Sequence, residues 1–85
     1  MDYFKEVYLL LKKKHYGGVL ELLYDSENRK IKGVYRCDLN HAWYIVGDVF
    51  YKKRQYQKAI NAFRRSIENR PNDLEALLAL ANCYS

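Results

Sequence analysis

The side chains that most often carry catalysis or bind metals are few and scattered along this chain of 85 residues. It has two histidines and two cysteines, which are His15, His41, Cys37 and Cys83. Neither histidine stands at a recognisable spacing from a cysteine or from paired carboxylates, and the cysteines lack the spacing of a metal or redox motif. Gly17-Gly18 lacks the lysine and the spaced glycines of a phosphate-binding loop. We therefore expect no enzymatic activity, no metal site and no cofactor.

Two short basic runs are a more prominent chemical feature. The chain has 15 lysines and arginines against 10 acidic residues, a net charge of +5. One run is Lys12, Lys13 and Lys14, and the other is Lys52, Lys53 and Arg54. Cations at the end of a helix usually offset its dipole, but a row of them can also hold phosphates. Binding of a nucleic acid or an acidic partner along this basic edge is our alternative function.

The strongest structural pattern lies in the stretch from Ala42 to Pro71. Trp43, Val46, Gly47 and Phe50 recur at helical spacing, so they line one face of a helix. A glycine inside a helix costs about 1 kcal/mol relative to alanine. That cost is understandable if a second helix must approach the backbone closely at this position.

The second helix of this stretch supplies Ala59 and Phe63, one turn apart, before Pro71 ends it. The whole pattern resembles the tetratricopeptide repeat, whose signature is W-x2-L-G-x2-Y, then A-x3-F, then P. Val46 replaces the leucine and Phe50 the tyrosine of that signature. The resemblance implies a pair of antiparallel helices over residues 40–73. We expect helices at Leu39–Lys53, capped by Asp38, and from about Tyr56 to Asn69.

A divergent repeat is expected before this one, over about residues 2–38. Tyr16, Val19 and Leu23 stand where Tyr56, Ala59 and Phe63 stand later. The offset between Tyr16 and Tyr56 is 40 residues, whereas repeats of this family recur about every 34 residues. Six residues are therefore inserted, and they fall between Ser26 and Asp38.

The first repeat begins with a helix over Asp2–Lys14 and a turn at His15–Gly18, after which Val19 starts a second helix. Residues 27–38 allow two interpretations. In one, the second helix continues to Lys32 and Gly33 caps it in the left-handed conformation. In the other, it ends at Asp25–Asn28 and a long loop follows. We favour the longer helix because lysines followed by a glycine are typical of a helix C-terminus.

A half repeat follows at residues 74–85, with a helix over Leu74–Tyr84 capped at Asn72-Asp73. Leu77, Leu80, Ala81 and Tyr84 are expected to face the fourth helix. The chain looks cut mid-repeat, either as a fragment of a longer array or as a chain completed by another molecule. The prediction is thus one all-α domain over residues 1–85. It is a right-handed stack of five helices in about two and a half repeats, without strands.

The resemblance implies a function as a protein-interaction scaffold. In this family the first helix of each repeat lines a concave groove that holds a peptide or helix of a partner protein. Carried over position by position, the groove residues are Phe4, Tyr8, Leu11, Lys12, His41, Tyr44, Ile45, Asp48, Lys52, Glu75, Leu78, Ala79 and Asn82. Aromatic and aliphatic side chains suit an apolar ligand.

Two further expectations concern partners and location. The helix over residues 74–84 carries leucines on more than one face, so we expect that it can self-associate with a second copy of the chain. The apolar runs are short and interrupted, which excludes a transmembrane span, and Met1 to Glu6 do not resemble a signal peptide. These features and the isolated cysteines favour the cytoplasm.

Overall fold

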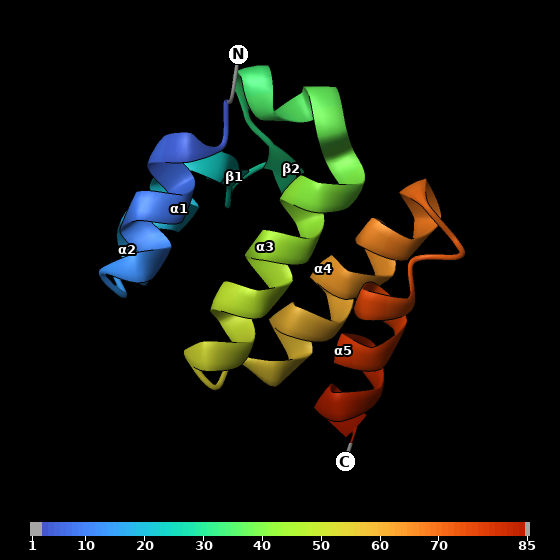
Figure 1. Cartoon of the computed structure of the whole chain (residues 1–85). Coiled ribbons are helices and arrows are strands. Elements are labelled where there is room, and N and C mark those ends of the chain that lie inside the picture. Colours follow the sequence, from blue (N-terminus) through green and yellow to red (C-terminus); the bar gives the residue numbers. More distant parts are fainter. Residues whose placement is uncertain (1–2, 85) are drawn as a thin grey trace.

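The computed structural model describes residues 3–84, and most of them lie in five helices (Figure 1). The helices are α1 (Lys5–Lys12), α2 (Tyr16–Leu23), α3 (Leu39–Lys52), α4 (Tyr56–Asn69) and α5 (Leu74–Tyr84). A small hairpin of strands β1 (Tyr24–Asp25) and β2 (Lys30–Ile31), followed by a 3-10 helix over Gly33–Asp38, joins α2 to α3. The fold is an all-α stack of helix pairs of the tetratricopeptide type.

Helix α3 forms the centre of the core. It packs most extensively on α4, and it also contacts α2, the hairpin and α5. Trp43 and Phe50 of α3 are buried together with Ala59 and Phe63 of α4 in one core cluster. Gly47 is the point of closest approach: a Cβ atom there would lie 2.6 Å from the ring of Phe63. The close approach of α4 therefore explains why a glycine stands inside α3, as expected.

The two helix pairs α1–α2 and α3–α4 close with the same turn. Lys14 has a φ of 60° and Arg54 a φ of 63°, so both are left-handed residues just beyond a helix. The next amide donates to a carbonyl five residues earlier, from His15 to Leu10 in one turn and from Gln55 to Phe50 in the other. These bonds define a Schellman motif. Both turns reverse the chain within three residues (Figure 1).

The prediction of an extended second helix is wrong. Helix α2 ends at Leu23, and the inserted residues fold into an antiparallel hairpin with Tyr24 opposite Ile31. Asp25 directs the turn, since its carboxylate accepts hydrogen bonds from the backbone of Glu27 and Asn28 and from the Asn28 side chain. The early end of the helix agrees with our second interpretation, but strands replace its loop. The expectation of a chain without strands is therefore also wrong.

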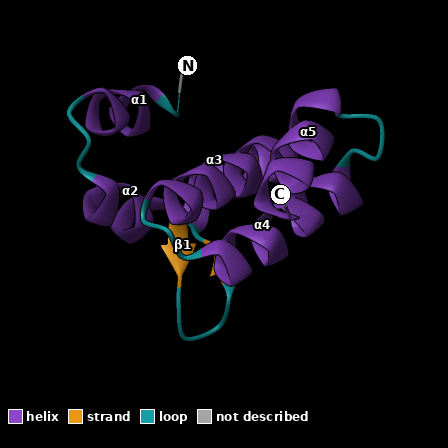
Figure 2. Cartoon of the chain, turned by 90° about the horizontal axis from the view of Figure 1, so that it is seen from below, coloured by secondary structure: helices purple, strands orange, loops and turns teal. Residues whose placement is uncertain are grey.

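Tertiary packing explains the hairpin. Tyr24 places its ring edge-on against Trp43 at 5.8 Å and against Phe50 at 5.7 Å between ring centroids. Ile31 is buried in the same core. Gly33 does adopt a positive φ of 49°, but it starts the 3-10 helix instead of capping α2. Figure 2 shows the hairpin between α2 and α4, beneath α3.

Smaller corrections concern helix ends. Helix α1 covers Lys5–Lys12, and the predicted start at Asp2 lies outside the described residues. The predicted turn at His15–Gly18 is wrong, because α2 already begins at Tyr16 and includes both glycines. Helices α4 and α5 have the predicted bounds, and α3 ends one residue early.

The two predicted N-caps are confirmed. The Asp38 carboxylate accepts a hydrogen bond from the His41 amide, and Asp73 accepts from the amides of Glu75 and Ala76. Asp73 also accepts from the side chain of Asn40, which ties the start of α5 to the start of α3.

Helix α5 is oriented differently from the expectation. Ala76 is fully buried, and Leu80 and Cys83 pack partly against the core. Leu77 and Tyr84, which we expected on the buried face, are 40% and 60% exposed. The packed face of α5 therefore consists of Ala76, Ala79, Leu80 and Cys83, while exposed Tyr84 still accepts a hydrogen bond from Arg64 of α4.

Candidate functional site

A cleft of about 350 Å³ lies between α3 and α5. We call it the front groove. It is lined by Tyr44, Asp48, Tyr51, Phe63, Glu75, Leu78, Ala79 and Asn82. Tyr44, Asp48 and Tyr51 follow one another at helical spacing on α3, and Glu75, Leu78 and Asn82 do so on α5. Two facing helix stripes therefore form its walls.

The floor of the front groove is aromatic. Phe63 of α4 closes the bottom, and Tyr44 leans against it with ring centroids 5.8 Å apart. Leu78 is 65% exposed on the opposite wall, which is a large exposure for an aliphatic side chain in a concave site. An incoming apolar side chain could cover Leu78 together with the exposed ring of Tyr51.

The rim of the front groove is mainly acidic. Asp48 forms an ion pair with Lys52 at 3.1 Å, and this hydrogen bond raises the pKa of Lys52. Burial raises the pKa of the Tyr44 hydroxyl, and the negative charges of Asp48 and Glu75 raise it further. The tyrosine therefore stays protonated and can act as a hydrogen-bond donor at neutral pH. The field inside the groove favours a cation.

The predicted groove residues near α1 form a separate aromatic cluster. The Tyr8 hydroxyl lies 2.6 Å from Nε2 of His41. Phe4 packs edge-on against His41 with ring centroids 4.8 Å apart. Phe4 is only 8% exposed and Ile45 only 4%, so both belong to the core and offer little surface to a ligand. Their helical positions matched the groove pattern, but neighbouring helices cover them.

The residues of the basic edge lie at the two Schellman turns. Lys13, Lys14, Lys53 and Arg54 are exposed, and both turns lie at the lower side of the view in Figure 1. Lys52 differs from the others, because it pairs with Asp48 and lies 6.0 Å above the ring of Tyr16. Its charge is therefore partly compensated.

Sequence reasoning missed Tyr51 and Phe63 as groove residues. Tyr51 stands seven residues after Tyr44, so helical spacing could have placed it on the same wall. Phe63 was assigned to the core, and it is indeed 1% exposed, but one side of its ring forms the groove floor.

This arrangement of packed antiparallel helix pairs defines a helical-repeat protein. Residues 41–73 match the tetratricopeptide repeat family, so this part of the chain is a tetratricopeptide repeat. No curated protein and no solved structure matches the chain. Repeats of this family typically form scaffolds for protein interaction, and residues 41–73 are a repeat of this type.

Among residues 3–84, no three histidine, cysteine or acidic side chains gather in a group that could hold a metal ion. None of the helices in the same range combines the length and the apolar character that a membrane crossing requires.

Proposed function

We propose that the front groove binds a segment of a partner protein that carries an apolar side chain beside a lysine or arginine. The observation that carries this proposal is the combination of an aromatic floor with an acidic rim. The apolar side chain would cover Tyr51 and Leu78, and the cation would meet Asp48 and Glu75. The Tyr44 hydroxyl would hydrogen-bond the backbone of the segment.

A peptide-display selection followed by calorimetry tests this proposal. A random peptide library is selected on the chain, and the affinity of the best peptides is measured. We expect them to combine an apolar and a basic residue, and the Tyr44→Ala, Asp48→Ala double variant to bind about tenfold or more weakly. The control is the Gln57→Ala variant, which changes an exposed residue of α4 and should bind the peptides like the parent.

The basic edge provides the competing outcome. If the selected peptides still bind the double variant, the front groove is not the site. If binding is then lost on replacing Lys13, Lys14, Lys53 and Arg54 with glutamine, the basic edge is the site instead. In that case a nucleic acid or an acidic partner becomes the main candidate.

A further inference from the structure

A second and larger cleft, of about 1000 Å³, lies on another side of the molecule. We call it the back cleft. Its walls are α2 with the β1–β2 hairpin on one side and α4 on the other, and it shares no lining residue with the front groove. Tyr24, Trp43 and Phe50 lie at its floor. The two clefts therefore flank the α3–α4 pair.

The inserted hairpin creates this cleft. Helix α2 packs on α1 and α3, whereas α4 packs on α3 and α5, so a gap remains between α2 and α4. The Tyr24 ring seals the bottom of the gap by packing on Trp43 and Phe50. The hairpin turn holds Arg29 at the wall in a left-handed conformation with a φ of 53°. Lys32 is anchored by donating a hydrogen bond to the Glu21 carbonyl.

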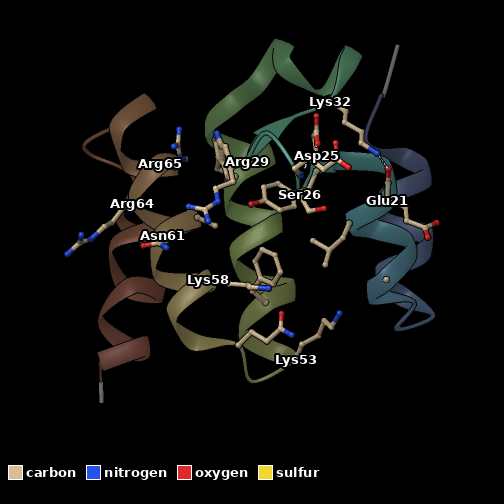
Figure 3. A pocket seen from close by; sticks show the side chains of 18 of the residues that line it. Glu21, Asp25, Ser26, Arg29, Lys32, Lys53, Lys58, Asn61, Arg64 and Arg65 are labelled. Atoms are coloured by element: carbon tan, nitrogen blue, oxygen red, sulfur yellow. Dashed lines mark hydrogen bonds between the residues drawn. The ribbon is translucent and has the colours of Figure 1, made fainter.

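Two cations from α4 lie over the aromatic floor. The Arg65 guanidinium is 5.2 Å from the centre of the Trp43 ring, and the Lys58 ammonium is 5.7 Å from that of Phe50. Such cation–π contacts position the charged groups before any ligand arrives. Figure 3 shows Lys58 at the centre of the cleft and Lys53 near its lower end.

Most of the positive charge in this cleft has no anionic partner. Six basic and four acidic side chains line it. Among residues 3–84, Asp48–Lys52 is the one ion pair, so Arg29, Lys53, Lys58 and Arg65 form no ion pair with a carboxylate of that range. Of the acidic side chains, Asp25 is engaged by the hairpin turn. The cleft thus presents several positioned cations above an apolar floor.

We infer that the back cleft is a second binding site, and that it takes an acidic segment of a partner protein. Carboxylates of the segment pair with Arg65 and Lys58, and its apolar side chains lie along Leu20 and Tyr24 on the opposite wall. The arginine can engage a carboxylate through two parallel hydrogen bonds. The chain would then bind two partner segments of opposite charge, one in each cleft.

The same observations disfavour a single-stranded nucleic acid as the occupant. Trp43 and Phe50 are only 6% and 5% exposed, and cations lie over both rings, so neither ring has a free face for base stacking. Glu21 and Glu68 also line the cleft and would repel a backbone that carries one charge per nucleotide. A peptide can space its carboxylates to avoid these positions.

Trp43 provides a direct test, because it is the only tryptophan of the chain and lies in this cleft. The probe is an extended peptide of about ten residues, with alternating glutamate and leucine and no tyrosine or tryptophan. Its extended length of about 33 Å matches the longest dimension of the molecule, 32 Å. We expect a saturable change in Trp43 emission with this peptide. The lysine analogue of the peptide and an oligothymidylate of similar charge should cause none.

Three variants localise the effect. Lys58→Gln with Arg65→Gln should weaken binding about tenfold or more, because two charge-assisted contacts are lost. Lys5→Gln with Arg70→Gln removes the same charge at exposed positions outside the cleft and should leave the affinity near that of the parent. Gly17→Glu adds a carboxylate to the α2 wall, where a new Cβ meets nothing within 4 Å, and should also weaken binding. Circular dichroism and melting curves verify that each variant is folded.

Three outcomes would overturn the inference. One is the absence of any saturable Trp43 response to the acidic peptide. Another is an equal loss of affinity in the two glutamine double variants, which would mean unspecific attraction to a basic protein. The third is a Trp43 response to the oligothymidylate at lower concentration than to the peptide. The Tyr44→Ala, Asp48→Ala variant should retain the response, which keeps this test independent of the front groove.

Discussion

Gly47 allows a close contact between two helices, because its missing side chain lets the Phe63 ring of α4 lie directly on the α3 backbone. That contact brings Phe63 to the floor of the front groove. Replacing a helical glycine with alanine normally stabilises a helix by up to about 1 kcal/mol. Here the added methyl group would sit 2.6 Å from ring carbons, so the balance is reversed.

We predict that Gly47→Ala lowers the free energy of unfolding by about 1–3 kcal/mol through overpacking. Gly17→Ala is the matched control, because its new methyl group meets nothing within 4 Å. It should leave stability unchanged or raise it by up to about 1 kcal/mol. Urea unfolding of both variants measures this difference. A Gly47→Ala protein as stable as the parent would show that the two helices are not in such close contact.

Asn40 forms a second residue-scale contact that connects three helices. Its side-chain amide donates toward the carbonyl and hydroxyl oxygens of Ser66 at 3.0 and 2.9 Å and toward the Asp73 carboxylate at 3.0 Å. Ser66 is fully buried and donates back to the Asn40 carbonyl at 2.8 Å. The hydrogen bond from Asn40 is the main cause that lowers the pKa of Asp73 below 3.8.

We predict that Asn40→Ala lowers the free energy of unfolding by about 1–3 kcal/mol at neutral pH, because buried Ser66 loses a partner. A lowered carboxyl pKa stabilises the fold above the unfolded pKa, and this contribution disappears as the pH falls through the folded pKa. The parent should therefore lose more stability than Asn40→Ala between about pH 6 and about pH 2. Urea unfolding at both pH values measures this. Asn61→Ala, an exposed position, should follow the parent, and equal acid losses for all three proteins would contradict the role of Asn40.

The Schellman turns are the main feature at the scale of elements. They end α1 and α3 with the same hydrogen bonds, 40 residues apart, and the buried positions Val19 and Leu23 of α2 correspond to Ala59 and Phe63 of α4. This likeness supports our proposal that α1 and α2 form a divergent first repeat. The left-handed position is held by Lys14 in one turn and by Arg54 in the other, although glycine is the usual residue there.

We predict that Arg54→Gly raises the free energy of unfolding by about 0.5–1 kcal/mol, because glycine adopts a positive φ without a steric penalty. The neighbouring Lys53 has a φ of −83°, so Lys53→Gly removes the same charge and should instead lower stability by a similar amount of about 0.5–1 kcal/mol. Thermal melting of the Arg54→Gly and Lys53→Gly variants beside the parent compares their stabilities. Equal effects of the two substitutions would mean that the turn does not have this conformation.

At the scale of the whole molecule, helix α5 presents an exposed apolar face that adjoins the front groove at Leu78. Leu74 is 78% exposed, and Leu77 and Leu78 are also exposed next to it. An apolar surface of this kind commonly mediates contact between proteins. A second copy of the chain could cover it through a two-fold arrangement, in which the same patch is used on both sides.

We predict that the chain self-associates reversibly through this face at concentrations of about tens of micromolar, as a small apolar interface would. Sedimentation equilibrium should give a mass above that of the monomer, and Leu78→Glu should restore the monomer mass. Lys13→Glu, an exposed change at the basic edge, is the control and should not dissociate the dimer. A monomer mass for the parent that Leu78→Glu leaves unchanged would contradict this prediction.

The α3–α4 pair and the cap of α5 were predictable from the sequence alone. Helical periodicity, an internal glycine opposite a phenylalanine, a proline after the last turn and aspartates before the helices are local signals. Each of these signals arises from residues about one helical turn apart or from a close contact between two adjacent helices. Gly47 and Phe63 meet as expected, and Asp38 and Asp73 cap the helices as expected. Most of the residues that line the front groove were expected only because the chain resembles the tetratricopeptide repeat.

Only the tertiary structure decided the hairpin, the packed face of α5 and the back cleft. The strands of the hairpin have two residues each, too few for a periodic pattern, and they are stabilised by the packing of Tyr24 on Trp43 and Phe50. The basic side chains of α4 gain their positions from rings on another helix, as Arg65 of α4 does from Trp43 of α3. Such contacts depend on how whole helices are placed, and short-range sequence preferences contain no information about that placement.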